Sequence, residues 1–338
     1  MKKLFATLPT GEQIYGYTIK GINAAAEIIT YGAAIQSLTI DGVDIVGGFD
    51  EIESYANDAS CQGVIIGRVA NRIENAAFTM DGIKYEVRKN NGKNSLHGGF
   101  EFNRSVWNVD TFSENSVTLS YLSRDGEYGF PGDLLTTVTY SFIGDALVID
   151  YKAMPKSKTP IALTNHVYFN LDGFGGDVKK HKLMIASQNY TEVDAELIPT
   201  GNRPSVCETV FDFRTMMPID RGLSDEDFCG YDNNFIITPT EFKEFGDKQL
   251  GLSAVLENDK LRLLTYSDQP CLQVYTGNGL GAPSDFDFKG GIKSIKYGAI
   301  CLETQTEPNC INHGAGFYDS GDTYTHTCVY SLEIKDRV

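Results

Sequence analysis

The feature that most constrains the fold is an alternation of apolar and polar side chains that recurs from one end of the chain to the other. The alternation flanks a two-residue turn at Asp41-Gly42, at Asp81-Gly82 and at Gly144-Asp145. Turns of this length and composition join neighbouring antiparallel strands, and Asp-Gly suits a type I′ turn. The same alternation runs through residues 117–121 and 324–334. The chain is therefore expected to be rich in antiparallel β-structure.

Helical periodicity is scarce, and we expect only short helical pieces at residues 50–55 and around 240–245. The 34 glycines among 338 residues exceed the usual share of roughly 7% and fit a fold with many turns. No linker, low-complexity tract or long repeat divides the sequence. We therefore predict a single all-β domain over residues 1–338, a large antiparallel β-sandwich or a closed sheet stack, folds in which a wide concave sheet face can hold a ligand.

Charge and cysteine content narrow the range of partners. A formal net charge of −16 opposes binding to nucleic acid or anionic membranes, although it leaves room for a local basic pocket. The seven cysteines are odd in number and contain no CxxC, which indicates buried thiols in a reducing compartment rather than disulfides or a metal site. No apolar run approaches the roughly 20 residues of a membrane span. We expect a soluble cytoplasmic protein.

Two of the five histidines have neighbours that favour a functional role. His97 is followed by two glycines, which allow a backbone to approach a ligand closely. At strand period, His166 shares one face with Tyr168 and Asn170. Histidine is the usual proton carrier near neutral pH. A hydrogen-bonded structural histidine is the alternative at both positions, and the residues alone favour neither interpretation.

Two carboxylates are candidates for acid–base or binding chemistry. Glu303 follows the apolar residues 299–302, so it is expected to be partly desolvated, which raises a carboxyl pKa and makes a better base. The alternative for Glu303 is a solvated residue on an edge strand. Asp232 lies in a loop that leads into an apolar strand, where an Asx-turn is the common structural role.

Further polar side chains lie in apolar surroundings in two other stretches. Arg68 and Arg72, with Asn71 between them, suggest a fork of fixed donors for hydroxyls or carboxylates. Pairing with structural acids explains the two arginines equally well. Gln273 and Tyr275 share one face of a predicted strand, where the glutamine would bind a sugar hydroxyl or merely satisfy a neighbouring backbone group.

Taken together, six short motifs resemble those of the aldose 1-epimerase (galactose mutarotase) family. In chain order they are GRVANRI at residues 67–73, NSLHGG at 94–99, TNHVYFNL at 164–171, GYDNNF at 230–235, LQVYTGN at 272–278 and CLETQ at 301–305. The resemblance extends from about residue 31 to residue 332. It implies the galactose mutarotase-like supersandwich, with a sugar bound on its concave face.

The resemblance also implies a role for each candidate residue. Glu303 matches the catalytic base, His166 the catalytic acid, and His97 a second active-site histidine near C1 and the ring oxygen. We further expect nearby carboxylates to help hold the proton of His166. The positions implied to bind sugar hydroxyls or to line the pocket are Asn71, Arg72, Tyr168, Asp232 and Gln273. One departure is Asn233, where many members carry histidine.

The implied function is that of an isomerase, an aldose 1-epimerase that interconverts the α- and β-anomers of unphosphorylated galactose or glucose in hexose metabolism. Acid–base ring opening and closure needs neither metal nor cofactor, and the chain would act as a monomer or homodimer. Two rivals are a glycoside hydrolase that uses Glu303 and Asp232 and a non-catalytic sugar-binding protein. A mutarotase of hexose 6-phosphates would want a basic phosphate cradle, which the sequence does not clearly contain.

Overall fold

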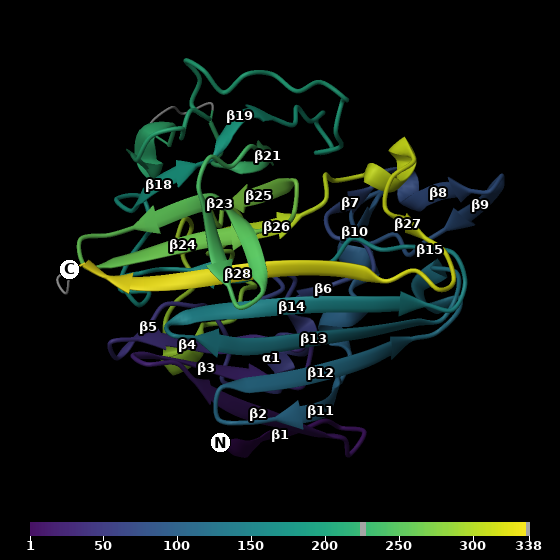
Figure 1. Ribbon diagram of the computed structural model, residues 1–338, viewed down its shortest axis with the longest axis horizontal. Coiled ribbons are helices and arrows are strands. Elements are labelled where there is room, and N and C mark those ends of the chain that lie inside the picture. The colour runs from purple at the N-terminus through teal and green to yellow at the C-terminus, as the bar shows by residue number, and fades with distance from the viewer. Residues whose placement is uncertain (224–227, 336–338) are drawn as a thin grey trace.

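The largest element of the fold is a ten-stranded antiparallel sheet that crosses the middle of the molecule (Figure 1). The computed structural model describes residues 1–223 and 228–335. In spatial order the strands of this sheet are β11 (Asn108–Phe112), β12 (Ser116–Ser123), β13 (Leu134–Ile143), β14 (Ala146–Pro155), β28 (Tyr324–Ile334), β24 (Leu261–Ser267), β23 (Lys248–Glu257), β18 (Lys182–Ile185) and β20 (Met217–Pro218), with β22 (Phe242–Phe245) paired to β23.

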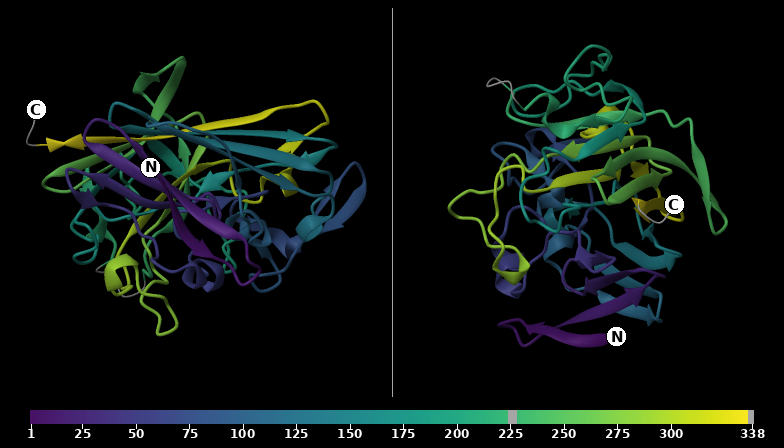
Figure 2. Two further views of the ribbon diagram at one scale, coloured as in Figure 1. Left: turned by 90° about the horizontal axis from the view of Figure 1, so that it is seen from below. Right: turned by 90° about the vertical axis from the view of Figure 1, so that its left-hand side faces the viewer.

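Two five-stranded sheets complete the main framework. The N-terminal sheet contains β1 (Lys2–Thr7), β2 (Gln13–Lys20), β3 (Ala24–Ile29), β4 (Ile35–Ile40) and β5 (Val43–Asp44). The other sheet has the order β17 (Tyr168–Phe169), β26 (Ile300–Gln305), β25 (Cys271–Tyr275), β21 (Asp232–Ile237) and β19 (Ser187–Tyr190). In the left view of Figure 2 the ten-stranded sheet runs along the top, with the smaller sheets beneath it. The expected antiparallel all-β sandwich is confirmed.

Short ribbons and single helical turns connect these sheets. The ribbons pair β6 (Ile65–Ile66) with β16 (Thr164–Asn165), β7 (Arg72–Ile73) with β10 (Ser95–Leu96), β8 (Ala77–Met80) with β9 (Ile83–Glu86), and β15 (Thr159–Pro160) with β27 (Phe317–Tyr318). The helical pieces are α1 (Ile52–Asn57) and the 3-10 turns η1 (Glu74–Ala76), η2 (His97–Gly99), η3 (Phe102–Arg104), η4 (Glu127–Gly129), η5 (Ile219–Arg221), η6 (Lys289–Gly291) and η7 (Cys310–His313).

The three predicted hairpin turns are present. Each joins two strands through the expected dipeptide: β4 to β5, β8 to β9, and β13 to β14. At Asp81-Gly82 both residues have positive φ, 52° and 79°, as a type I′ turn requires. The C-terminal strand β28 has the predicted bounds, and α1 overlaps the helical piece expected at residues 50–55.

The helix expected around residues 240–245 is wrong, because that segment forms strand β22. β22 pairs with β23, so that Phe242 opposes Gly251 and Phe245 opposes Lys248. Phe245 is buried, with its ring centroid 5.2 Å from that of Tyr266. Packing against an existing strand thus outweighs local helical preference, which is a weak determinant in a short segment.

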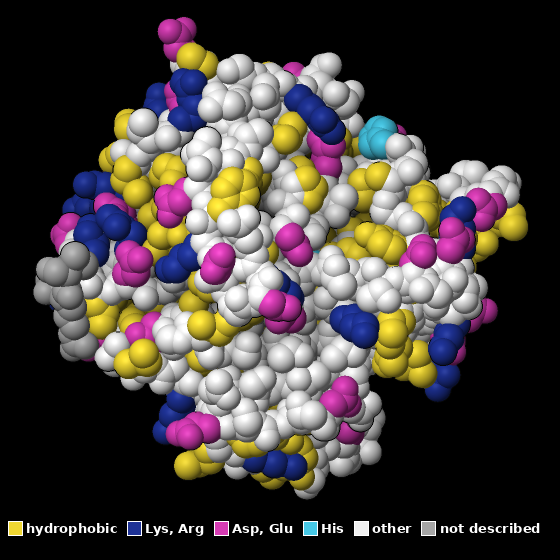
Figure 3. Space-filling view, viewed as in Figure 1, with side chains coloured by type: hydrophobic (Ala, Val, Ile, Leu, Met, Phe, Trp, Pro, Cys, Tyr) yellow, Lys and Arg dark blue, Asp and Glu magenta, His cyan; other side chains and the backbone are white. Residues whose placement is uncertain are grey.

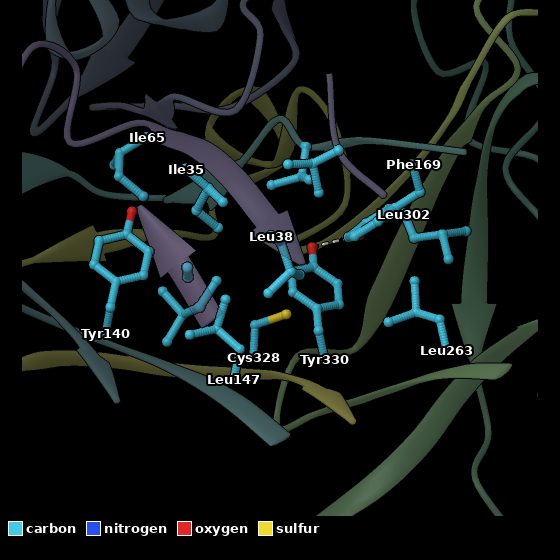
Figure 4. Close-up of a cluster of buried hydrophobic side chains, with 14 of the residues drawn as sticks. Ile35, Leu38, Ile65, Tyr140, Leu147, Phe169, Leu263, Leu302, Cys328 and Tyr330 are labelled. Atoms are coloured by element: carbon cyan, nitrogen blue, oxygen red, sulfur yellow. Dashed lines mark hydrogen bonds between the residues drawn. The ribbon is translucent and has the colours of Figure 1, made fainter. Parts of the chain in front are cut away.

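One hydrophobic core joins the three main sheets. Leu38 of the N-terminal sheet, Ile149 of the ten-stranded sheet and Leu302 of β26 belong to one buried cluster and are fully inaccessible. Figure 4 shows side chains of this cluster converging from the different sheets. Burying each such side chain contributes about 1.5–3 kcal/mol. The core therefore fixes β26 against the sheet behind it.

On the face shown in Figure 3, acidic and basic side chains are interspersed with apolar ones. Within residues 1–223 and 228–335, no helix is long and apolar enough to cross a membrane. All seven cysteines are free, as predicted, and five are buried. Cys207 and Cys229 are exposed, so the expectation of buried thiols is wrong for these two.

We expect Ile149→Ala to lower the free energy of unfolding by about 2–5 kcal/mol, because it leaves a cavity in the core. Ile143→Ala is the matched control, since Ile143 lies on the neighbouring strand but is 45% exposed, and surface changes usually stay within about 0.5 kcal/mol. Urea unfolding followed by circular dichroism measures both. Equal losses in the two variants would contradict the assignment of the core.

Candidate active site

Three neighbouring strands of the β17–β19 sheet place polar side chains in a row. Glu303 lies on β26, Gln273 directly opposite it on β25, and Asp232 at the start of β21. β26 pairs with β17 on one side and β25 on the other, so the alternative of a solvated edge-strand glutamate is excluded. The sheet therefore brings two carboxyl groups and an amide from distant parts of the chain to one wall of a cavity.

A separate ribbon supplies a second wall. Leu96 of β10 opposes Arg72 of β7, which brings His97 beside Asn71. The His97 N–H donates to the Asn71 carbonyl at 3.0 Å, and the Asn71 N–H donates to His97 Nδ1 at 3.2 Å. At Gly98 a Cβ would lie 2.0 Å from the carbonyl oxygen of Gly67, so only glycine permits this close approach.

His97 has a defined protonation state. Burial lowers its pKa well below 6.5, and the nearby His166 and Arg72 lower it further. Because Nδ1 accepts a hydrogen bond from the backbone, the proton of the neutral ring lies on Nε2. His97 is therefore a neutral donor on the wall of the site.

His166 lies between β16 and β17, close to both Glu303 and His97. Its Nε2 is 3.7 Å from Oε1 of Glu303, and its ring centroid is 5.1 Å from that of His97. The ring also stacks on Tyr168 at 5.1 Å. On the opposite edge, Nδ1 lies 3.6 Å from Sγ of Cys301. Burial raises the pKa of that thiol well above 9, so it keeps a proton to donate to Nδ1.

The expectation that carboxylates hold the proton of His166 is wrong. Burial lowers the pKa of His166 to about 4. Burial also raises the pKa of Glu303 well above 4.5, and the charge of Asp232 raises it further, whereas Arg72 lowers it. The nearby carboxyl group thus carries too little charge to offset the desolvation of the imidazole. The low polarity of the site favours neutral forms of both groups.

Glu303 has an oxygen that the protein does not use. The residue is only 2% exposed, and within the described part of the chain its Oε2 has no hydrogen-bond partner. A buried acceptor without a partner costs free energy, which a ligand hydroxyl would recover. The predicted partial desolvation of Glu303 is thereby confirmed.

Arg72 and Asp232 add opposite charges to the same site. Gln273 Nε2 donates to Asp232 Oδ1 at 2.6 Å, and Arg72 Nε donates to Asn91 Oδ1 at 3.2 Å. Burial raises the pKa of Asp232, whereas Arg72 and the hydrogen bond from Gln273 lower it. Asn233 supports this arrangement, because its Oδ1 accepts the Asp232 N–H at 3.2 Å. The side chains form a fixed set of donors and acceptors suited to hydroxyl groups.

All eight predicted site residues line one cavity of about 420 Å³. They are Asn71, Arg72, His97, His166, Tyr168, Asp232, Gln273 and Glu303. The fork predicted from two arginines is wrong for Arg68, which is fully buried and donates from Nε to Ser123 and from Nη1 to the carbonyl of Pro131. The backbone turns at Asn71, where φ is 60°, so the two arginines serve different regions.

The sequence interpretation missed the rim of this cavity. Tyr275 also lines the cavity, and the strand face that it shares with Gln273 is the sequence signal that could have identified it. Residues 57–60, which begin at the last residue of α1, and residues 284–286 line the cavity as well. These two segments carry no recognisable motif, and only the tertiary fold brings them to the site.

Comparison with known proteins identifies the family of this chain. The sequence model for aldose 1-epimerase matches residues 16–331. The galactose mutarotase of Bos taurus is 35% identical over 346 residues, covering 98% of both chains. The aldose 1-epimerase of Escherichia coli K12 is 35% identical over 323 residues, covering 91% of this chain and 90% of that one.

Solved structures share the fold. An aldose epimerase homologue from C. elegans superposes with a TM-score of 0.84 at 29% identity, covering 94% of this chain and 98% of that one. A galactose 1-epimerase from Lactobacillus acidophilus NCFM has a TM-score of 0.86 at 22% identity, covering 99% and 98% respectively, and supports the fold alone. Because the family model matches residues 16–331, which are nearly the whole chain, the chain belongs to the aldose 1-epimerase family.

Proposed function

We propose that this protein interconverts the α- and β-anomers of an unphosphorylated aldose, galactose or glucose, by opening and closing the pyranose ring. The observation that carries the proposal is the 3.7 Å approach of His166 Nε2 to Glu303 Oε1 within a cavity lined by hydrogen-bonding side chains. Binding alone does not require a buried acid–base pair. Mutarotation requires one, because two protons move at neighbouring oxygens.

In the proposed opening step, the Glu303 carboxylate takes the proton of the C1 hydroxyl and the His166 imidazolium protonates the ring oxygen. The O1–H electron pair becomes the π bond of the aldehyde, and the C1–O5 pair passes to the ring oxygen. Rotation about C1–C2 and the reverse proton transfers give the other anomer. The protein ends as it began, so the reaction balances without a cofactor.

Burial suits both partners to this step. A carboxylate with a raised pKa is a stronger base, and an imidazolium with a lowered pKa is a stronger acid. After opening, both groups are neutral, which the low polarity of the site favours. The pair carries one titratable proton throughout, on His166 before ring opening and on Glu303 after it. The same total protonation of the pair therefore serves ring opening and ring closure for both anomers.

The remaining cavity residues are proposed to bind the sugar. His97 donates from Nε2 near C1 and the ring oxygen. Arg72, Asp232 and Gln273 bind ring hydroxyls, Asn71 lies beside them, and Tyr168 lines the pocket. We further propose that the protein is cytoplasmic, since seven unpaired thiols suit a reducing compartment. We also propose that it acts as a monomer or a homodimer.

Glu303→Gln is expected to slow mutarotation of fresh α-D-galactose by about 10²–10⁴-fold, because the amide cannot accept the O1 proton. Polarimetry measures the rate above the spontaneous background. Sugar binding, followed by ligand-induced thermal stabilisation, should persist. Near-normal rates would remove Glu303 as the base, and release of an aryl group from an aryl galactoside would instead favour a glycoside hydrolase.

Glu303→Gln should also change how stability depends on pH. The raised pKa of Glu303 means that the folded state holds this proton more tightly than the unfolded state, so stability is lost as pH rises above the unfolded value of about 4.3. The glutamine variant lacks this loss. The difference in Tm, variant minus wild type, should therefore be more positive at pH 8 than at pH 5. His166 is present in both proteins, so its own titration largely cancels. A pH-independent difference would refute the shift.

A further inference from the structure

The two segments that carry the proposed acid and base are tied together on their buried side. Thr164 Oγ1 donates to the carbonyl oxygen of Thr304 at 2.8 Å. Thr164 precedes His166 by two positions, and Thr304 directly follows Glu303. This bond therefore links the segment that carries His166 to the strand that carries Glu303, although the two bonded residues lie 140 positions apart in the chain.

Tyr330 forms a second tie from the sheet behind. Its hydroxyl lies 2.8 Å from Asn165 Oδ1 and 3.0 Å from the carbonyl oxygen of Leu302. Both partners are acceptors, so the single phenolic proton is shared between them. Asn165 directly precedes His166, and Leu302 directly precedes Glu303. Figure 4 shows the hydroxyl of Tyr330, on β28, directed toward Leu302.

A longer chain of contacts also joins Asn165 to Thr304, through Tyr151 and His326. Asn165 Nδ2 donates to the hydroxyl of Tyr151 at 2.9 Å. The Tyr151 ring stacks on His326 with centroids 4.4 Å apart, and His326 Nε2 lies 3.0 Å from Thr304 Oγ1. Each of these residues is at most 2% exposed. Hydrogen bonds in such a dry environment are strong and hold a defined geometry.

Resting on the proposed function, we infer that Tyr330 and Asn165 are positioning residues that hold His166 and Glu303 at their working separation. Neither residue lines the cavity. Both therefore act indirectly, through the positions of His166 and Glu303, which directly follow Asn165 and Leu302 in the chain. A phenylalanine at position 330 would fill almost the same volume, and the hydroxyl adds only bonds to the two catalytic segments. General acid–base catalysis depends steeply on position, and a shift of about 1 Å can cost about 100-fold in rate.

Tyr330→Phe tests the inference, with Tyr140→Phe as the matched control. Tyr140 is also fully buried on the ten-stranded sheet, and its hydroxyl donates to the carbonyl of Ala33 at 2.6 Å, away from the catalytic segments. We expect comparable losses of Tm in the two variants. Only Tyr330→Phe should lower kcat for galactose mutarotation, by about tenfold, with KM changed less than about twofold.

The pH profile of kcat/KM provides a readout that a purely structural role would not move. A changed separation between His166 and Glu303 alters their mutual influence, so the limbs of the profile should shift in Tyr330→Phe and not in Tyr140→Phe. If Tyr330→Phe fails to fold, Tyr151→Phe, which removes the acceptor of Asn165, is measured in its place with the same expectations.

The inference is overturned if the folded Tyr330→Phe or Tyr151→Phe protein keeps the wild-type kcat and pH profile, or if Tyr140→Phe loses the same activity. Wild-type enzyme is assayed first against the spontaneous rate. An inactive wild type refutes the proposed function itself, whereas an active wild type with unaffected variants refutes only the positioning role.

Discussion

The proposed activity depends above all on burying an imidazole and a carboxyl group, those of His166 and Glu303, beside each other. Water would screen His166 and Glu303 and leave each near its ordinary pKa. Within the protein, burial lowers the pKa of the imidazole to about 4 and raises that of the carboxyl group. Both groups are thereby moved away from the charged forms, which makes the carboxylate a stronger base and the imidazolium a stronger acid. Arg72 and Asp232 adjust this balance from opposite directions.

The sheet that carries Glu303 has two different faces. Leu302 belongs to the core shared with the ten-stranded sheet, whereas the next residue, Glu303, lines the cavity on the opposite face. Glu303 sits on an interior strand, with neighbours that also carry polar side chains into the cavity. His166 lies between the short strands β16 and β17, and the separate β7–β10 ribbon positions His97 and Arg72. The ten-stranded sheet lies behind these elements and shares one core with them. Catalytic geometry and packing are therefore parts of the same structure.

Local chemistry made much of this fold predictable. Two-residue turns and strict alternation located the hairpins and the bounds of β28, and the ordered motifs identified eight of the residues that line the cavity. Nonlocal contacts account for what the sequence missed. Residues 242–245, in the segment predicted to be helical, form a strand because β23 offers an edge for pairing. Arg68 turned inward, and the rim at residues 57–60 reached the site only through the tertiary fold. The lowered pKa of His166 follows from burial, which no local pattern reports.

The central claim is that His166 and Glu303 work as one buried pair that shares a single proton. The dependence of kcat/KM on pH for wild-type mutarotation of galactose tests this most directly, because it reports the pKa values of the free enzyme. Activity should stay near its maximum down to about pH 4, where His166 gains a second proton for the pair. An acidic limb near pH 6.5, the value of an ordinary histidine, would contradict the account.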